Sequence, residues 1–274
     1  MLQTRFGFLL LGMAWLGSVH GQSLKGKITL TAAPKLLTPY RVTNHQGVCG
    51  QNVPNESLLA GKKLELANVV VFVANLKPEP GLPHTFIPLD MQNCVFKPHV
   101  LAALPGDTLL LRNQDAVSHD ARGELFAFRA GWDSRVTRDL FQTDSQTAFN
   151  FVLPAPEATA IAVFERPGLV RVRSKSGHDW MQAYILVLPH RAFAVSDMKG
   201  EFTLPRLPSG KYDLILWHEY LGVKRQLLEI VGSKTAELLI AWEIPEEMKA
   251  PAANGASEVP PVAPVDSTGQ KMNP

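Results

Sequence analysis

Short apolar runs of strand length recur along this chain of 274 residues, and proline and glycine separate them about every dozen residues. The stretch 66–73 (LANVVVFV) is nearly continuous and rich in β-branched residues, which is typical of a strand covered on both faces. A second run occupies 182–188, and Val170 and Val172 alternate with arginines. The pattern predicts an all-β sandwich or barrel and disfavours βαβ units.

Composition sets bounds on size and partners. The hydrophobic content is 46%, which is enough to bury one large or two modest cores. The formal net charge is only +2, and no dense run of Lys and Arg occurs. We therefore expect neither nucleic acid nor an anionic membrane surface as a partner.

The two ends of the chain differ from its middle. Residues 1–21 combine one early cation with a short apolar run and a small-residue cleavage site, which predicts a secretory signal peptide. The run is too short for a typical transmembrane helix, although an uncleaved anchor is the alternative. We expect a periplasmic or secreted protein whose mature chain has no transmembrane segment. Residues 246–274 are dominated by Pro, Ala, Gly and Ser from 251 onward and predict a flexible tail.

The chain has two cysteines, Cys49 and Cys94. Neither belongs to a C-x-x-C pair of the kind that binds metals. Disulfides persist in the compartment that a signal peptide implies, so a structural Cys49–Cys94 disulfide is the first interpretation. Two free buried thiols are the alternative.

Two loop motifs carry the clearest chemistry. One is Asn113-Gln-Asp-Ala-Val-Ser-His119, and the other is Ser176-Gly-His-Asp-Trp-Met181. Together with Phe96-Lys-Pro98 and Gly106-Asp107, they resemble the copper-binding pattern of the cupredoxins, the plastocyanin-like proteins. The resemblance implies a Greek-key sandwich over 22–190, with both loops at one end.

The same resemblance implies a metal site. His119 and His178 match copper ligands, and Met181 matches the weak axial ligand. The alternatives are hydrogen-bonded loop histidines and a core methionine. His45, His84 and His190 show no ligand pattern.

The cysteine that cupredoxins place shortly before the second histidine is missing. The corresponding positions read Ser174, Lys175 and Ser176. A trigonal blue-copper centre cannot form without that thiolate, and the Lys175 ammonium would repel a cation unless it swings away. Copper could still bind to two histidines and a methionine, with His99 or water completing the site. The alternative for His99 is a histidine at a strand end.

A longer series of motifs narrows the resemblance. Glu56-Ser-Leu58, Leu66-Ala-Asn-Val-Val-Val71, Cys94 with Pro98-His-Val100, and Trp217-His-Glu219 are similar to pieces of exported bacterial cupredoxin-like proteins described as methylamine-utilisation-like. This similarity extends over roughly 45–225.

Residues 191–245 resemble the closing half of a carboxypeptidase-regulatory or transthyretin-like β module. Tyr212, Leu214 and Leu216 share one strand face, and His218 follows on that face as an inward histidine whose polar atoms are satisfied by Glu219 or a backbone carbonyl. Because half a module cannot close its own core, we expect it to pair with the strands at 25–30 and 67–74.

These observations leave three classes of function. The first hypothesis is a cupredoxin-like scaffold or binding module without a metal, whose partner is an envelope protein or a glycan. The alternative is a copper-binding, copper-handling or electron-transfer protein with a His2Met-type site. An enzyme is disfavoured, because the sequence shows no nucleophile–base pairing and no phosphate-binding glycine loop, and so no catalytic residue is assigned.

Overall fold

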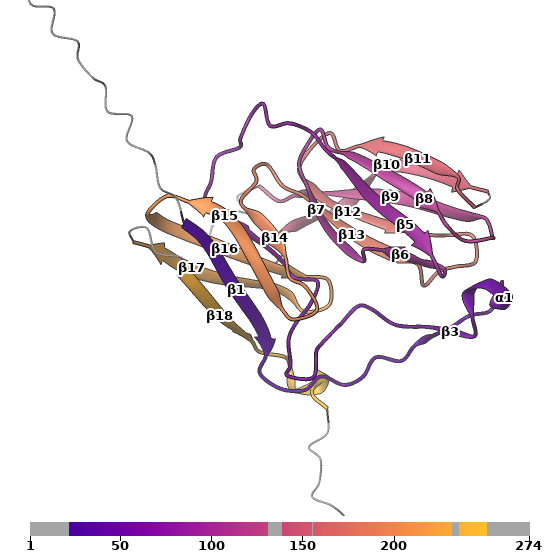
Figure 1. Cartoon of the computed structure of the whole chain (residues 1–274), viewed down its shortest axis with the longest axis horizontal. Helices are drawn as coiled ribbons and strands as arrows, with labels where there is room; N and C mark the ends of the chain where they lie inside the picture. The colour runs from indigo at the N-terminus through magenta and orange to yellow at the C-terminus, as the bar shows by residue number, and fades with distance from the viewer. Residues whose placement is uncertain (1–21, 131–138, 155, 232–235, 251–274) are drawn as a thin grey trace, which may run out of the picture.

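The computed structural model describes residues 22–130, 139–154, 156–231 and 236–250. Its chain forms two β units that lie side by side (Figure 1). The predicted signal peptide, 1–21, lies outside the described residues. Within these ranges, neither of the two short helices has the length and apolar character of a membrane span. The all-β prediction is confirmed.

The larger unit is a sandwich of two sheets, with strand orders β10-β9-β12-β13-β7 and β11-β8-β5-β6. Its core lies between the sheets and includes Phe96, Leu111 and Ile185. The alternating burial of β8 and β12 places one face of each strand in this core. Its strands are β5 (Phe86–Gln92), β6 (Val95–Lys97), β7 (Val100–Ala103), β8 (Thr108–Asn113), β9 (His119–Phe128), β10 (Phe141–Leu153), β11 (Thr159–Val163), β12 (Gly168–Arg173) and β13 (Gln182–Val187).

The smaller unit also has two sheets, ordered β15-β1-β18 and β14-β4-β16-β17. Strand β1 lies in the middle of the first sheet, antiparallel to β15 and parallel to β18. Strand β4 lies between β14 and β16 in the second. The strands are β1 (Gln22–Leu30), β4 (Val70–Val73), β14 (Phe193–Val195), β15 (Glu201–Leu207), β16 (Gly210–His218), β17 (Gly222–Ile230) and β18 (Ala236–Trp242).

The predicted boundary that gave 22–190 to the sandwich is wrong at two places. Strands β1 and β4 belong to the smaller unit, where they complete the half-module of 191–245. The expected pairing of that half-module with 25–30 and 67–74 is confirmed. The sandwich strands, β5 to β13, are therefore inserted into the smaller unit between β4 and β14.

A third cluster of buried side chains joins the two units. Val71 and Val73 face the core of the smaller unit, whereas Val70 and Phe72 face the other way. On that second side they share a cluster with Leu186 of β13 and with residues of β7 and β16. The predicted strand at 66–73 is confirmed for 70–73 alone, where β4 is buried at every position; residues 66–69 precede the strand, and Asn68 among them has a φ of 61°.

A long excursion between β1 and β4 reaches the sandwich (Figure 1). We call residues 40–53 the arm; it contains β2 (Tyr40–Arg41), the four-residue helix α1 (Gln46–Cys49) and β3 (Asn52–Val53). Val42, Cys49 and Val53 of the arm are buried in the sandwich core. The predicted Cys49–Cys94 disulfide is confirmed and ties the arm to the β5–β6 turn.

The predicted tail is wrong for its first residues. Residues Glu246–Met248 form a short 3-10 helix, η1. The backbone N–H of Lys35 donates to the carbonyl of Met248, and that of Ala250 donates to Ala33, at 2.7 and 2.8 Å. Residues 246–250 thus pack against the start of the excursion, while 251–274 lie outside the described residues.

Candidate metal centre

His119 and His178 meet at one end of the sandwich. His119 opens β9, and His178 lies in the loop between β12 and β13. Their Nδ1 atoms are 3.3 Å apart, and the two side chains are almost fully buried. Two nitrogens that bind one tetrahedral metal at about 2.0–2.1 Å lie about 3.3 Å apart. The separation of the two rings therefore suits a shared metal ion.

Asp115 fixes the orientation of His119. The His119 Nε2 atom is 2.9 Å from Asp115 Oδ2. An ionised carboxylate can only accept, so Nε2 carries the proton and Nδ1 presents a bare lone pair toward His178. The same carboxylate accepts the backbone N–H groups of Asn93 and Cys94 at 2.7 and 2.8 Å. One residue thus positions both a ligand candidate and the disulfide.

The other nitrogen of His178 faces the arm. Its Nε2 atom is 3.1 Å from Nδ1 of His45, an exposed residue just before α1. Burial, followed by the nearby His119 and His45, lowers the pKa of His178. A neutral imidazole keeps a lone pair for a cation in mildly acidic conditions. Asp115, His119, His178 and His45 form one row from the interior to the surface.

His45 is the residue that sequence reasoning missed. It lies 133 positions from His178, in a loop with no motif of its own. The only available signal was its position four residues before Cys49, because a disulfide to Cys94 brings this part of the arm to the metal-site end.

Ser174, Lys175 and Ser176 stand where cupredoxins have their cysteine. Of these three, only Ser174, which follows β12 directly, is buried. Its hydroxyl donates to Asp120 at 2.6 Å, and the backbone N–H groups of Lys175 and Ser176 donate to the same carboxylate. Burial alone would raise the pKa of Asp120, but these hydrogen bonds outweigh it and hold the pKa below its ordinary value. Lys175 is exposed, so its ammonium does not occupy the centre.

Met181 and His99 have different environments. Met181 is fully buried in the sandwich core, and its backbone N–H donates to the carbonyl of His178 at 2.8 Å. His99 lies elsewhere: its Nε2 atom pairs with the carboxylate of Glu219, beyond β16 in the smaller unit. The structure therefore pairs His99 with Glu219 and not with His119 or His178, which does not support it as a replacement ligand. It bridges the two units instead.

The disulfide lies beside the histidine pair. One potential ligand atom each from Cys49, Cys94 and His178 falls within 4.8 Å of the others, and the same holds for Cys94, Asp115 and His119. Trp180 closes this side, because its Nε1–H donates to the carbonyl of Cys94 at 2.9 Å. Its ring also meets His178 edge to face.

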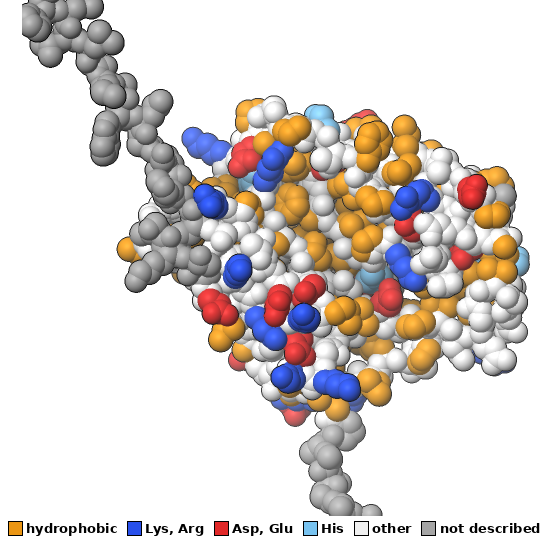
Figure 2. Space-filling view, in the orientation of Figure 1, with side chains coloured by type: hydrophobic (Ala, Val, Ile, Leu, Met, Phe, Trp, Pro, Cys, Tyr) orange, Lys and Arg blue, Asp and Glu red, His pale blue; other side chains and the backbone are white. Residues whose placement is uncertain are grey.

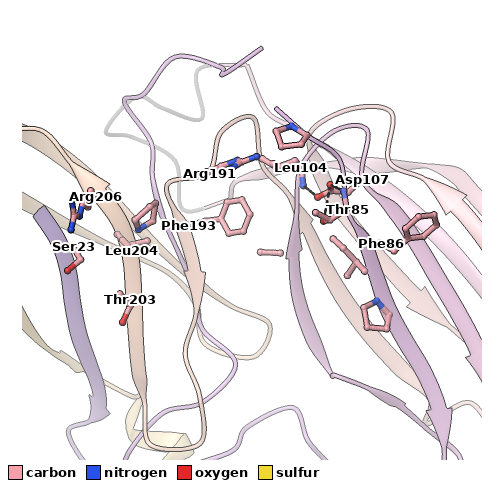
Figure 3. A pocket seen from close by; sticks show the side chains of 15 residues that line it. Ser23, Thr85, Phe86, Leu104, Asp107, Arg191, Phe193, Thr203, Leu204 and Arg206 are labelled. Carbon is pink, nitrogen blue, oxygen red and sulfur yellow. Dashed lines mark hydrogen bonds between the residues drawn. The ribbon is translucent and has the colours of Figure 1, made fainter. Parts of the chain in front are cut away.

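A groove of about 850 Å³ lies between the two units, and Phe86, Phe193, Leu204, Arg191 and Arg206 contribute to its walls (Figure 3). Hydrophobic side chains also gather near this junction on the face drawn in Figure 2, whereas acidic and basic groups are interspersed elsewhere. The groove borders the start of β8, and the histidine pair borders its end. The two features therefore lie at opposite ends of that strand.

Several copper proteins of known structure are similar to part of this chain. The Cu-containing nitrite reductase (NirK) from Thermus scotoductus SA-01 is 20% identical over 42% of this chain, with a TM-score of 0.26. Amicyanin from Paracoccus versutus is 15% identical over 43% of this chain and 97% of its own, with a TM-score of 0.25. Auracyanin from Roseiflexus castenholzii is 13% identical over 40% of this chain and 100% of its own, with a TM-score of 0.28.

The chain spans only 24% of the length of the nitrite reductase. No protein-family model and no curated protein matches it. Each of these three matches covers less than half of this chain.

Proposed function

We propose that this protein binds one copper ion between His119 and His178, in a site that is not a blue-copper centre. The observation that supports the proposal is the 3.3 Å separation of two buried Nδ1 atoms, one of which has its lone pair fixed by Asp115. Ser174 at the cysteine position means that no thiolate comes from this loop. Imidazole nitrogens suit copper, and a thioether ligand from Met181, the predicted axial ligand, would favour Cu(I).

Copper bound there would supply a one-electron centre of soft character. The chain's own part is to exchange a proton at His178. Without a cation, His178 Nδ1–H can donate to the bare Nδ1 of His119. With both Nδ1 atoms engaged by a cation, the proton moves to Nε2 and donates to His45, 3.1 Å away. This exchange needs no buried charge on either ring, and it makes the row suited to holding copper.

A titration with Cu(I) against a competing chelator, and with Cu(II), tests the proposal on the purified protein. We expect one equivalent to bind. His119→Ala and His178→Ala should each weaken binding more than about 100-fold, and Asp115→Asn by about 10- to 100-fold, because outer partners typically matter by that factor. His84→Ala is the matched control, since His84 is exposed in the loop before β5.

Binding that ignores both histidine substitutions, or no binding at all, would contradict the copper site. The groove between the units would then favour the other candidate, a metal-free module that binds an envelope protein or a glycan. The Cys49–Cys94 disulfide is typical of an oxidising compartment, which supports a periplasmic or secreted location. That location is compatible with either function. Kinship with methylamine-utilisation-like proteins and with transthyretin-like modules stays a prediction, and we propose no catalytic role.

A further inference from the structure

The two sulfurs of the disulfide lie beside the histidine pair. Cys49 and Cys94 each have a sulfur within 4.8 Å of a ring nitrogen of His178. The sulfur of Cys94 also lies within 4.8 Å of a ring nitrogen of His119. In the oxidised chain these sulfurs carry no negative charge and are weak ligands. As thiolates they are strong ones, because the thiolate is the metal-binding form of cysteine.

From this juxtaposition we propose that reduction of the Cys49–Cys94 disulfide converts the histidine pair into a two-sulfur, two-nitrogen site for a tetrahedral d10 cation, with Zn²⁺ as its best fit. The inference rests on the proposed metal site, since it uses the same His119 and His178. A dithiol supplies two electrons and two protons to the disulfide and is itself oxidised to a disulfide. Each resulting thiol then loses its proton as its sulfur binds the cation.

Cys94 is held in place for this role. Its backbone N–H donates to Asp115, which also binds His119, and its carbonyl accepts from Trp180. These bonds do not depend on the disulfide. One sulfur and one imidazole are thus oriented by the same carboxylate, which is the arrangement of outer partners that metal sites commonly use.

Cys49 is the sulfur that can move. Two thiolates at about 2.3 Å from a tetrahedral metal lie about 3.7 Å apart, so the sulfurs must separate after reduction. Helix α1 has only four residues, of which Cys49 alone is buried. His45 and Gly50 flank it with φ values of 54° and 76°. Within the helix only this cysteine is buried against the sandwich, and the arm on either side is held by Val42 and Val53, which lie in the sandwich core.

The test compares Zn²⁺ affinity of the oxidised protein and of protein reduced with dithiothreitol and freed of it under anaerobic conditions. We expect the reduced protein to bind one Zn²⁺ at least about 100-fold more tightly, given the strength of thiolate ligands. Zinc should also shield both thiols from a chromogenic disulfide reagent. Replacing zinc with Co²⁺ should give the thiolate charge-transfer absorption of a tetrahedral site.

Two variants make the outcome decisive. The double variant Cys49→Ser/Cys94→Ser and the variant His178→Ala should each lose the tight zinc binding, whereas His84→Ala should keep it. Equal zinc affinity in both redox states, zinc binding that ignores His178→Ala, or a reduced chain that unfolds and is not restored by zinc would each overturn the inference. Copper binding by the oxidised protein is measured separately, so either proposal can fail alone.

Discussion

At the scale of single residues, His218 connects burial to acid sensitivity. Its Nδ1 atom accepts the backbone N–H groups of Tyr220 and Leu221 in the β16–β17 turn. Burial lowers the pKa of His218 to about 4, from an ordinary value of 6.5. As the pH falls below 6.5, the unfolded chain takes up this proton and the folded chain does not. The stabilisation present above pH 6.5 is therefore lost progressively toward pH 4.

We expect His218→Asn to flatten this acid limb. The asparagine carbonyl can still accept from the turn, but it does not titrate. Between pH 7 and pH 4 the loss of unfolding free energy should be smaller than in the wild type by up to about 3 kcal/mol. Urea unfolding at a series of pH values measures it, with the exposed His84→Asn as control. An unchanged acid limb in His218→Asn would show that His218 is protonated in the folded chain.

At the scale of elements, β1 is the strand on which the smaller unit depends. A Cβ on Gly26 would lie 2.3 Å from Cζ of Phe202, a buried ring of β15. Glycine is thus required here because the ring occupies the space above it, while the backbone itself is ordinary. The sheet cannot accept even one added methyl group without moving a core side chain.

Gly26→Ala should therefore lower the free energy of unfolding by about 1–3 kcal/mol, the usual cost of overpacking. Gly47→Ala is the matched control, because a Cβ at Gly47 in α1 meets nothing within 4 Å. Thermal unfolding followed by circular dichroism separates the two. A Gly26→Ala protein as stable as the control would mean that Phe202 moves freely aside.

At the scale of the whole molecule, the cluster that joins the units predicts their cooperativity. Leu186 of β13 is fully buried in this cluster, against Phe72 of β4 and Ile215 of β16. We expect one unfolding transition in scanning calorimetry. Leu186→Ala should lower the unfolding free energy by about 2–5 kcal/mol and shift that single transition. Leu227→Ala, at a leucine of β17 that is 67% exposed, should leave it unchanged.

A Leu186→Ala protein whose smaller unit melts first, with the sandwich unchanged, would contradict this coupling.

The pair formed by His99 and Glu219 belongs to the same junction. The ring of Tyr184 meets His99 edge to face in this junction. Burial and the neighbouring Glu219 raise the pKa of Tyr184, so its hydroxyl stays neutral there.

The sequence was sufficient for features that depend on local pattern. It predicted a buried strand within 66–73, of which 70–73 is a strand, the Cys49–Cys94 disulfide, and a histidine from each of two loops that the fold brings together. It predicted that 25–30 pairs with 191–245, yet the boundary at 22–190 gave the same strand to the sandwich. The register of β1 could not be predicted, because Leu24 pairs with Leu204 and Ala236 far along the chain. His45 and His99 show the same difficulty at residue scale. Both are loop histidines in sequence, and only the path of the arm and the junction of the units decides their partners.

The insertion of the sandwich has a consequence for synthesis. Strand β1 leaves the ribosome long before β15 and β18, its two partners, while β5 to β13 emerge in between with their partners close at hand. Because the chain is made from its N-terminus, we expect the sandwich strands β5 to β13 to fold first. Strand β1 then stays unpaired until β15 and β18 have been made. For that interval β1 has two bare edges, and a holdase that covers extended apolar segments would be its natural first partner.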